Sequence, residues 1–217
     1  MTVDSWSTQY AARREIAKRF GDVFSLPLAK RPRDVLLDQL GDGGCVLEVG
    51  AGDRRMKRAL EEGRNAVYRS LDVDPHGRHD FRDWSEIDEA FDLIFAFEVV
   101  EHVEVAALAD MLSNVKRVLK PGGRLVLSTP NIYYPPAYLR DVTHRTPLCF
   151  DELGGLVERA GLRVTGVLRT YHDPLHRRLL KRYALGWLFR TLGIDFARQI
   201  VLVAENPAET QATRSAA

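Results

Sequence analysis

Short apolar runs alternate along this chain with segments in which hydrophobic residues have helical spacing. Cys45–Val49 and Phe91–Phe97 are nearly continuous apolar runs, and such runs are typical of strands buried on both faces of a sheet. Glycine and proline residues end several of the helical segments. The expected strands are 45–49, 66–71, 91–97, 124–128, 162–169 and 197–203, and the expected helices are 10–20, 34–40, 54–62, 105–119, 151–160 and 175–189.

Strands that alternate with helices in this way predict an α/β fold of the doubly wound type, with a mostly parallel sheet covered on both sides. A chain of 217 residues is long enough for one well-formed core. We therefore expect one domain in which residues 1–40 form an N-terminal helical cap and residues 41–205 form the core. Residues 206–217 are small and polar without periodicity, and we expect a disordered tail there.

The composition indicates which compartment and which classes of partner to expect. Lys and Arg number 31 against 30 Asp and Glu, and this balance argues against a nucleic-acid partner. Two cysteines are too few for a disulfide framework and fit a reduced compartment. The chain has no apolar signal core and no stretch near the roughly 20 apolar residues that span a bilayer. We expect a cytoplasmic protein without stable membrane insertion, and its oligomeric state stays open.

A glycine turn follows the first long strand, in the order Glu48-Val49-Gly50-Ala51-Gly52. Ligands of doubly wound sheets bind at such strand ends, where glycines let the backbone approach closely. Asp72 ends the next strand at a spacing typical of a carboxylate that binds ribose hydroxyls. A plain strand-to-helix turn is the alternative. Arg55 stands where a dinucleotide site has its third glycine, which weakens a nicotinamide interpretation.

Two more segments, 91–94 with 98–103 and 119–125, follow the glycine turn in 46–52 and the acidic strand end in 71–74. With them the chain resembles the class I S-adenosylmethionine-dependent methyltransferases, from about Val46 to Val203. Residues 128–131 and His144 look like the subgroup of ubiquinone-type O-methyltransferases. The resemblance implies a seven-stranded Rossmann-like sheet. The space between Asp72 and Phe91 is short for this family, so we expect a shortened second half-unit with only a short strand at 79–83.

The resemblance implies S-adenosylmethionine as the cofactor. Arg54 stands where the family usually has a third glycine, and its side chain either reaches the cofactor carboxylate or points to solvent. Asp83 would accept from the adenine amino group, with Asp80 as the second candidate, and Trp84 would pack on the ring or fill the core. The expected cofactor-binding residues are Glu48, Gly50, Ala51, Gly52, Arg54, Asp72, Val73, Asp83, Trp84, Phe97 and Glu98.

A methyltransferase that acts on a hydroxyl needs a group to take the proton, and histidine titrates near neutral pH. His102 follows the fourth strand of the family pattern, and His144 lies in the long connection 131–148, where Asp141 would orient it. Structural roles for both histidines are the alternative. The connection would act as a substrate lid. Its expected substrate-binding residues are Asn131, Tyr133, Tyr134, Tyr138 and Arg145. No ligand set specifies a metal, and none is expected.

The sequence therefore predicts methyl transfer, with O-methylation favoured, to a small-molecule or lipid-linked acceptor. One alternative is a non-catalytic nucleotide-binding or regulatory protein with the same fold, and a weaker one is a nicotinamide-dependent oxidoreductase. Residues 175–189 mix basic and apolar side chains, which suits either a membrane surface or a crossover helix with a solvated basic face. We favour the crossover helix.

Overall fold

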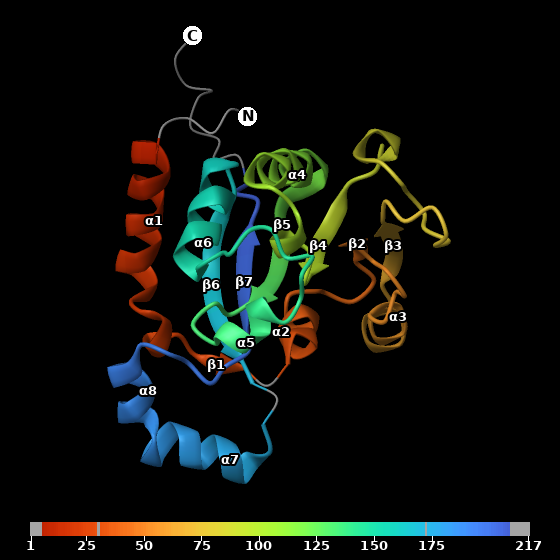
Figure 1. The fold of residues 1–217 in the computed structure, drawn as a ribbon. Coiled ribbons are helices and arrows are strands. Elements are labelled where there is room, and N and C mark those ends of the chain that lie inside the picture. Colours follow the sequence, from red (N-terminus) through yellow and green to blue (C-terminus); the bar gives the residue numbers. More distant parts are fainter. Residues whose placement is uncertain (1–5, 30, 172, 209–217) are drawn as a thin grey trace.

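The computed structural model describes residues 6–29, 31–171 and 173–208. Its centre is a seven-stranded sheet with the strand order β1-β6-β7-β5-β4-β2-β3 (Figure 1). The strands β5, β7 and β6 pair antiparallel, and the other neighbours pair parallel, so the predicted, mostly parallel sheet is confirmed. The strands are β1 Leu28–Ala29, β2 Cys45–Val49, β3 Val67–Leu71, β4 Phe91–Phe97, β5 Leu119–Pro130, β6 Arg163–Thr170 and β7 Gln199–Glu205.

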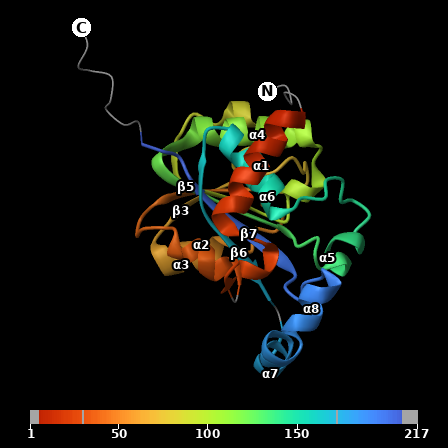
Figure 2. The same cartoon turned by 90° about the vertical axis from the view of Figure 1, so that its left-hand side faces the viewer.

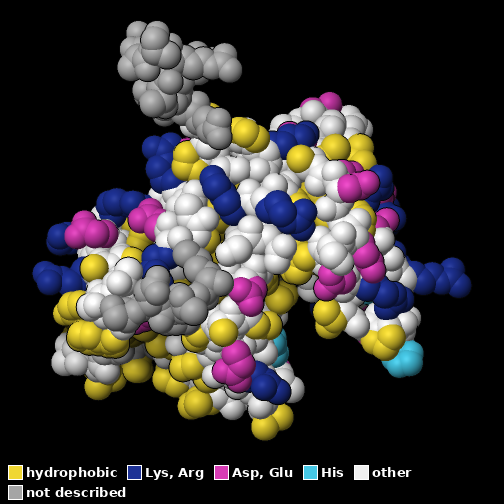
Figure 3. All heavy atoms as spheres, turned by 90° about the horizontal axis from the view of Figure 1, so that it is seen from above, with side chains coloured by type: hydrophobic (Ala, Val, Ile, Leu, Met, Phe, Trp, Pro, Cys, Tyr) yellow, Lys and Arg dark blue, Asp and Glu magenta, His cyan; other side chains and the backbone are white. Residues whose placement is uncertain are grey.

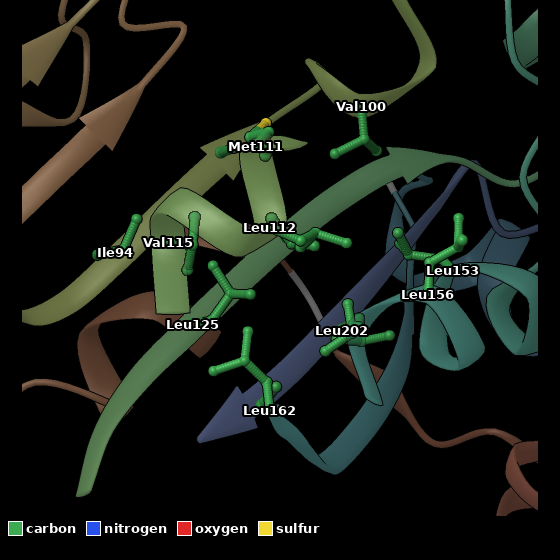
Figure 4. Packing of buried hydrophobic residues seen from close by; sticks show 14 of the residues in the cluster. Ile94, Val100, Met111, Leu112, Val115, Leu125, Leu153, Leu156, Leu162 and Leu202 are labelled. Carbon is green, nitrogen blue, oxygen red and sulfur yellow. The ribbon is translucent and has the colours of Figure 1, made fainter. Parts of the chain in front are cut away.

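Helices cover both faces of the sheet (Figure 2). One face carries α1 Trp6–Phe20, α4 Val105–Val118 and α6 Phe150–Arg159, and the other carries α2 Pro32–Asp38 and α3 Lys57–Arg64. Side chains of a strand alternate between the faces. Ile94 of β4 accordingly joins the cluster of α4, which Figure 4 shows beside Leu125, whereas Phe95 joins the cluster of α2 and α3.

The helix α1 packs closely against α6, although the two are far apart in the sequence. A Cβ atom on Gly154 would lie 3.0 Å from the Ile16 side chain, and one on Gly155 would lie 3.1 Å from the Arg13 nitrogen. The Arg13 guanidinium also pairs with Asp151 at 2.8 Å. Small residues on α6 therefore let the N-terminal helix seal one face of the core.

Two elements differ from the sequence prediction at the sheet edges. The short strand expected at 79–83 is a single bridge between Leu71 and Phe81, so the second half-unit is shortened further than expected. The seventh strand is instead β1, whose two residues pair with β6 at the opposite edge. The two residues of β1 are too few to show an alternating pattern in the sequence. Only their pairing with β6 defines them as a strand.

Other boundaries shift by a few residues. The long connection after β5 contains a helix, α5 Pro135–Leu139, and the expected helix 175–189 is divided into α7 Leu175–Leu179, a π turn at Leu180–Ala184 and α8 Gly186–Leu192. Short 3-10 turns occupy Val23–Ser25, Trp84–Glu86 and Val100–His102. The expected tail begins within the described residues at Asn206, whereas residues 209–217 lie outside them.

A buried ion pair joins the N-terminal segment to the end of the sheet beside α5 and α8. The Arg169 guanidinium donates to Asp195 at 2.9 Å, to the Phe24 carbonyl at 2.9 Å and to the Leu26 carbonyl at 3.0 Å. Asp195 also accepts from the Asn131 amide at 2.9 Å. Buried charges need such partners, because an unpaired one is costly to desolvate.

The surface is mixed in charge. Figure 3 shows basic and acidic side chains interspersed over the face seen from above, which agrees with the balanced composition. No helix in the described residues is long and apolar enough to cross a bilayer. The segment α7–α8 projects away from the sheet (Figure 1) and exposes several large apolar side chains, namely Leu175, Leu179, Leu180, Tyr183, Trp187 and Leu192.

Candidate active site

The turn after β2 requires glycine at its first position. Gly50 has a φ of 68°, which favours glycine, and a Cβ there would lie 2.5 Å from a Val99 methyl group. Val99 follows β4, which is the neighbour of β2 in the sheet. The turn after β2 and the segment after β4 thus lie against each other at the point where the strand order reverses, where doubly wound folds bind ligands.

Asp72 stands beside this turn, at the end of β3, as the sequence predicted. Its carboxylate accepts from the Gly52 nitrogen at 2.7 Å and from the Asp74 nitrogen at 2.9 Å. A carboxylate has about four acceptor sites, so two stay free for a ligand. The backbone bonds fix the orientation of Asp72 toward the glycine turn.

Glu48 is buried beneath the turn and accepts a hydrogen bond from the Tyr68 hydroxyl. Burial raises the pKa of Glu48 to about 7 from its usual 4.5, and the nearby charges of Asp53 and Asp72 add to the effect. Its side chain supports the strand that carries the turn.

This raised pKa predicts how stability depends on pH. Folding favours the protonated Glu48, so the folded protein loses stability as pH rises from about 4.5 to about 7, and the loss is complete above that range. The variant Glu48→Gln keeps an acceptor for Tyr68 without a charge. We expect it to be more stable than the wild type above pH 7, by on the order of 2 kcal/mol, and to converge with it near pH 4.5. Urea unfolding of both proteins across this range measures the difference, and parallel curves would contradict the assignment.

Arg54 occupies a left-handed backbone position, with a φ of 55°, next to the glycine turn. Its nitrogen donates to the Ala51 carbonyl at 2.7 Å. This conformation is not helical, and α3 accordingly begins later, at Lys57.

Replacing Arg54 by glycine should therefore stabilise the fold. The left-handed conformation costs a non-glycine residue about 1–2 kcal/mol, and the greater freedom of glycine in the unfolded chain offsets roughly half of that. We expect Arg54→Gly to raise the free energy of unfolding by about 0.5–1 kcal/mol. The matched control is Arg55→Gly, because Arg55 has no positive φ and should lose stability. Denaturant unfolding measures the stability of both variants. Equal losses of stability in the two would show that the Arg54 backbone is not strained.

The remaining predicted cofactor residues have mixed surroundings. Asp83 caps its own turn by accepting from Ser85, and Trp84 is half-buried against the core. Asp80, the second candidate for the adenine group, accepts from the Ser70 nitrogen and hydroxyl at 2.8 Å. Val73 is 86% exposed, whereas Phe97 packs in the cluster of α2 and α3.

A pocket of about 530 Å³ opens after the ends of β4 and β5, and its residue Glu98 directly precedes Val99, which lies against Gly50. Its lining combines residues of the predicted site with residues that sequence reasoning missed. From the prediction come Glu98, His102, Tyr134, Asp141 and His144; new are Glu101, Pro136, Ala137, Arg140, Arg198 and Gln199.

The two predicted histidines meet in this pocket, with their ring centroids 4.8 Å apart. His144 Nδ1 lies 2.7 Å from the Tyr138 carbonyl oxygen. A carbonyl only accepts, so Nδ1 carries a hydrogen, and in the neutral ring the lone pair is then on Nε2.

The other ring has the same tautomer. His102 Nδ1 lies 2.9 Å from Thr143 Oγ1, and that hydroxyl donates its own hydrogen to Asp141 at 2.7 Å. Nδ1 of His102 must then be the donor, which leaves Nε2 as an acceptor. Asp141 was expected to orient His144, but the hydrogen bonds link it through Thr143 to His102.

Glu101 is fully buried at the same pocket, and neither carboxylate oxygen receives a well-aligned hydrogen bond from the described residues. Desolvation, with the nearby Glu98 charge, raises the pKa of Glu101 to about 8. Glu98 itself has a φ of 54° and accepts from the Ser128 hydroxyl at 2.8 Å. Strained backbone of this kind is concentrated at functional sites.

Sequence reasoning expected no metal ligands, yet Glu101, His102 and His144 each bring one ligand atom to within 4.8 Å of the others. The missed signal was two glutamates three positions apart, followed directly by histidine, after a buried strand. A 3-10 turn at Val100–His102 places both Glu101 and His102 at the pocket.

The predicted substrate residues divide between the pocket and its support. Tyr134 lines the pocket, and the Tyr138 ring lies 5.0 Å from that of His144. Asn131 is buried, and its amide bonds Asp195 and the Tyr133 nitrogen, so it fixes the start of the connection. The remaining two lie elsewhere: Tyr133 packs against Phe24, and Arg145 pairs with Glu104.

Together, the fold and the turn define an α/β protein that binds a nucleoside cofactor at the carboxyl ends of its strands. A family model described as a methyltransferase domain matches residues 18–196. The chain belongs to this family and is a methyltransferase domain of the class I, S-adenosylmethionine-dependent type.

Two curated relatives match part of the chain. A probable S-adenosylmethionine-dependent methyltransferase of Mycolicibacterium smegmatis is 37% identical over 90 residues, which are 39% of this chain and 34% of that protein. Dimethylglycine N-methyltransferase of Parasynechococcus marenigrum is 32% identical over 115 residues, which are 44% and 40% of the two chains. The matched part spans well under half the length of either relative.

Among solved structures, a SAM-dependent methyltransferase from Archaeoglobus fulgidus superposes with a TM-score of 0.60. It covers 88% of this chain and 98% of its own, at 16% sequence identity, and this likeness shows the fold.

The residues present fit the cofactor of the family, S-adenosyl-L-methionine. The space beside Gly50 would be filled by any Cβ, and the Asp72 carboxylate with free acceptor sites stands next to it. Gly50, Gly52 and Asp72 would hold the nucleoside, and Arg54 lies at the side of the turn where α3 begins.

Proposed function

We propose that the protein is an O-methyltransferase acting on a small molecule that carries a hydroxyl group. One observation carries the proposal: two histidines meet in a pocket after β4 and β5, and each is held through Nδ1, so that the neutral ring has its lone pair on Nε2. A hydroxyl is a weak nucleophile until its proton is removed, whereas a neutral amine needs no such group.

S-adenosylmethionine, held by Gly50, Gly52 and Asp72, would supply an electrophilic methyl group to the acceptor oxygen, and its sulfur would keep the electron pair of the C–S bond. The pocket residues place the hydroxyl and take its proton on an imidazole Nε2. Thr143 and Asp141 hold the His102 ring, and the Tyr138 carbonyl holds that of His144. Positioning of this kind lowers the barrier by up to roughly 7–11 kcal/mol.

The rim of the pocket favours a polar or anionic acceptor. Arg140 and Arg198 both line it, and Arg198 also lies over the Tyr134 ring at 5.9 Å. An acceptor with a carboxylate or phosphate would meet these guanidinium groups. A lipid-linked acceptor, as in the ubiquinone-type subgroup, is supported by the exposed apolar side chains of α7 and α8.

A transfer screen tests the proposal. Purified protein with methyl-labelled S-adenosylmethionine is mixed with pools of phenols, hydroxy acids, sugars and matching amines, and the products are identified by mass spectrometry. We expect label on oxygen. Label on nitrogen, as the likeness to dimethylglycine N-methyltransferase would suggest, overturns O-methylation. Cofactor binding without transfer to any pool favours a regulatory protein with the same fold.

A further inference from the structure

We infer that Glu101, His102 and His144 form a binding site for one divalent transition-metal cation. The three residues come from two segments, the 3-10 turn after β4 and the connection after β5, and both meet at the acceptor pocket.

The donor set has the composition of a metal site. One carboxylate oxygen and one nitrogen from each imidazole lie within 4.8 Å of one another. Ligands of one ion lie about 3–3.5 Å apart when the bonds are near 2.1 Å, and small side-chain rotations from this arrangement give that spacing. Imidazole with carboxylate suits Mn²⁺, Co²⁺, Fe²⁺ or Zn²⁺ better than the all-oxygen preference of Mg²⁺.

The hydrogen bonds around the cluster also support a metal site. Both Nδ1 atoms donate to oxygens, one to the Tyr138 carbonyl and one to Thr143, which in turn donates to Asp141. Metal-binding histidines usually donate their second nitrogen to a carbonyl or a carboxylate in this manner, which fixes the ring and leaves Nε2 for the ion.

The centre of the cluster contains a buried carboxyl group without a well-aligned hydrogen bond. Glu101 is fully buried, neither of its carboxyl oxygens has such a partner among the described residues, and one ligand atom of each histidine lies within 4.8 Å of it. Buried polar atoms without partners are costly. A cation at this point satisfies all three groups at once.

This inference rests on the proposed function for its chemistry. With three protein ligands, the ion keeps coordination positions open toward the pocket, and the acceptor hydroxyl would bind there through its oxygen. With the ion bound, the two histidines would act as ligands in place of the proton-accepting role proposed above for the metal-free pocket, and the hydroxyl would release its proton to solvent more readily. An acceptor with two adjacent hydroxyl oxygens would fill two open positions, so catechols and vicinal diols are the favoured substrates.

Metal binding is testable without any acceptor. The full chain is stripped with a chelator and titrated with Co²⁺, with the visible absorption of the bound ion and calorimetry as readouts. We expect one equivalent to bind, and His102→Ala, His144→Ala and Glu101→Gln each to weaken binding by about tenfold or more. His176→Ala, an exposed histidine on α7, is the matched control and should bind like the wild type.

The outcomes separate this site from the proposed function. Absence of a Co²⁺ signal, or equal affinity in His144→Ala and the control, overturns the metal site, and the cluster then holds a shared proton. If Glu101→Gln does not fold, the two histidine variants decide alone. Affinity for S-adenosylmethionine is measured in parallel: retained cofactor binding without Co²⁺ leaves the methyltransferase standing, and Co²⁺ binding without methyl transfer overturns only O-methylation.

Discussion

The variant Gly50→Ala should lose at least about 100-fold in affinity for S-adenosylmethionine, or roughly 2.7 kcal/mol. Two effects combine: the φ of 68° disfavours alanine, and the new methyl group would sit 2.5 Å from Val99. Val99 must then shift, and it connects β4 to the acceptor pocket. Calorimetry with the cofactor and with S-adenosylhomocysteine measures the loss.

Gly43→Ala is the matched control for Gly50→Ala. Gly43 has a φ of 75°, but no heavy atom lies within 4 Å of the position of its Cβ, so this variant introduces strain without a clash. It should lose stability and keep its affinity for the cofactor. Adding Val99→Ala to Gly50→Ala should restore part of the binding. A folded Gly50→Ala protein that binds the cofactor like the wild type would show that the turn is not its site.

Loss of either pocket histidine should abolish most turnover. We expect His102→Ala and His144→Ala each to lower kcat by about 10²–10⁴-fold on the acceptor found by the screen, because each removes a group that acts on the acceptor hydroxyl. Neither side chain lies in the glycine turn, so the cofactor affinity should change by less than about twofold. Single-turnover transfer of the labelled methyl group separates the two quantities.

A third variant tests how the rings are held. Thr143→Val removes the hydroxyl that joins His102 to Asp141 and should lower kcat by a smaller factor, while the pH profile of kcat shifts. His176→Ala on α7 is the control and should leave turnover unchanged. Wild-type turnover in both His102→Ala and His144→Ala would remove the chemical basis of the proposed reaction.

The central strands were predictable because their local pattern and their environment agree. Phe91–Phe97 is apolar except for Asp92, and the structure buries it between two helical layers, so its sequence pattern alone was sufficient to predict the strand. The edge strand β1 has only two residues, and its pairing partner β6 lies more than 130 residues later in the chain. Such an element exists through tertiary contact and carries no local signal.

The sequence indicated where in the fold the candidate site lies, but it did not indicate how the individual side chains are oriented there. Gly50 and Asp72 were predicted from the spacing of the glycine turn and the acidic strand end, and the structure places Asp72 against that turn. Asp83 was assigned to the adenine group, but its carboxylate is engaged by Ser85, which only the turn geometry reveals. Glu101 was overlooked because a glutamate next to a histidine predicts nothing until a turn buries it.

The Arg169 network makes the segment around Phe24 and Leu26 an integral part of the fold. Its guanidinium finds two of its three acceptor residues, Phe24 and Leu26, in that segment. A protease that trimmed the protein back to Pro32 would leave this charge with Asp195 alone, inside a dry interior. Because Asp195 also holds Asn131, where the acceptor loop starts, such trimming would switch the enzyme off instead of releasing an active fragment.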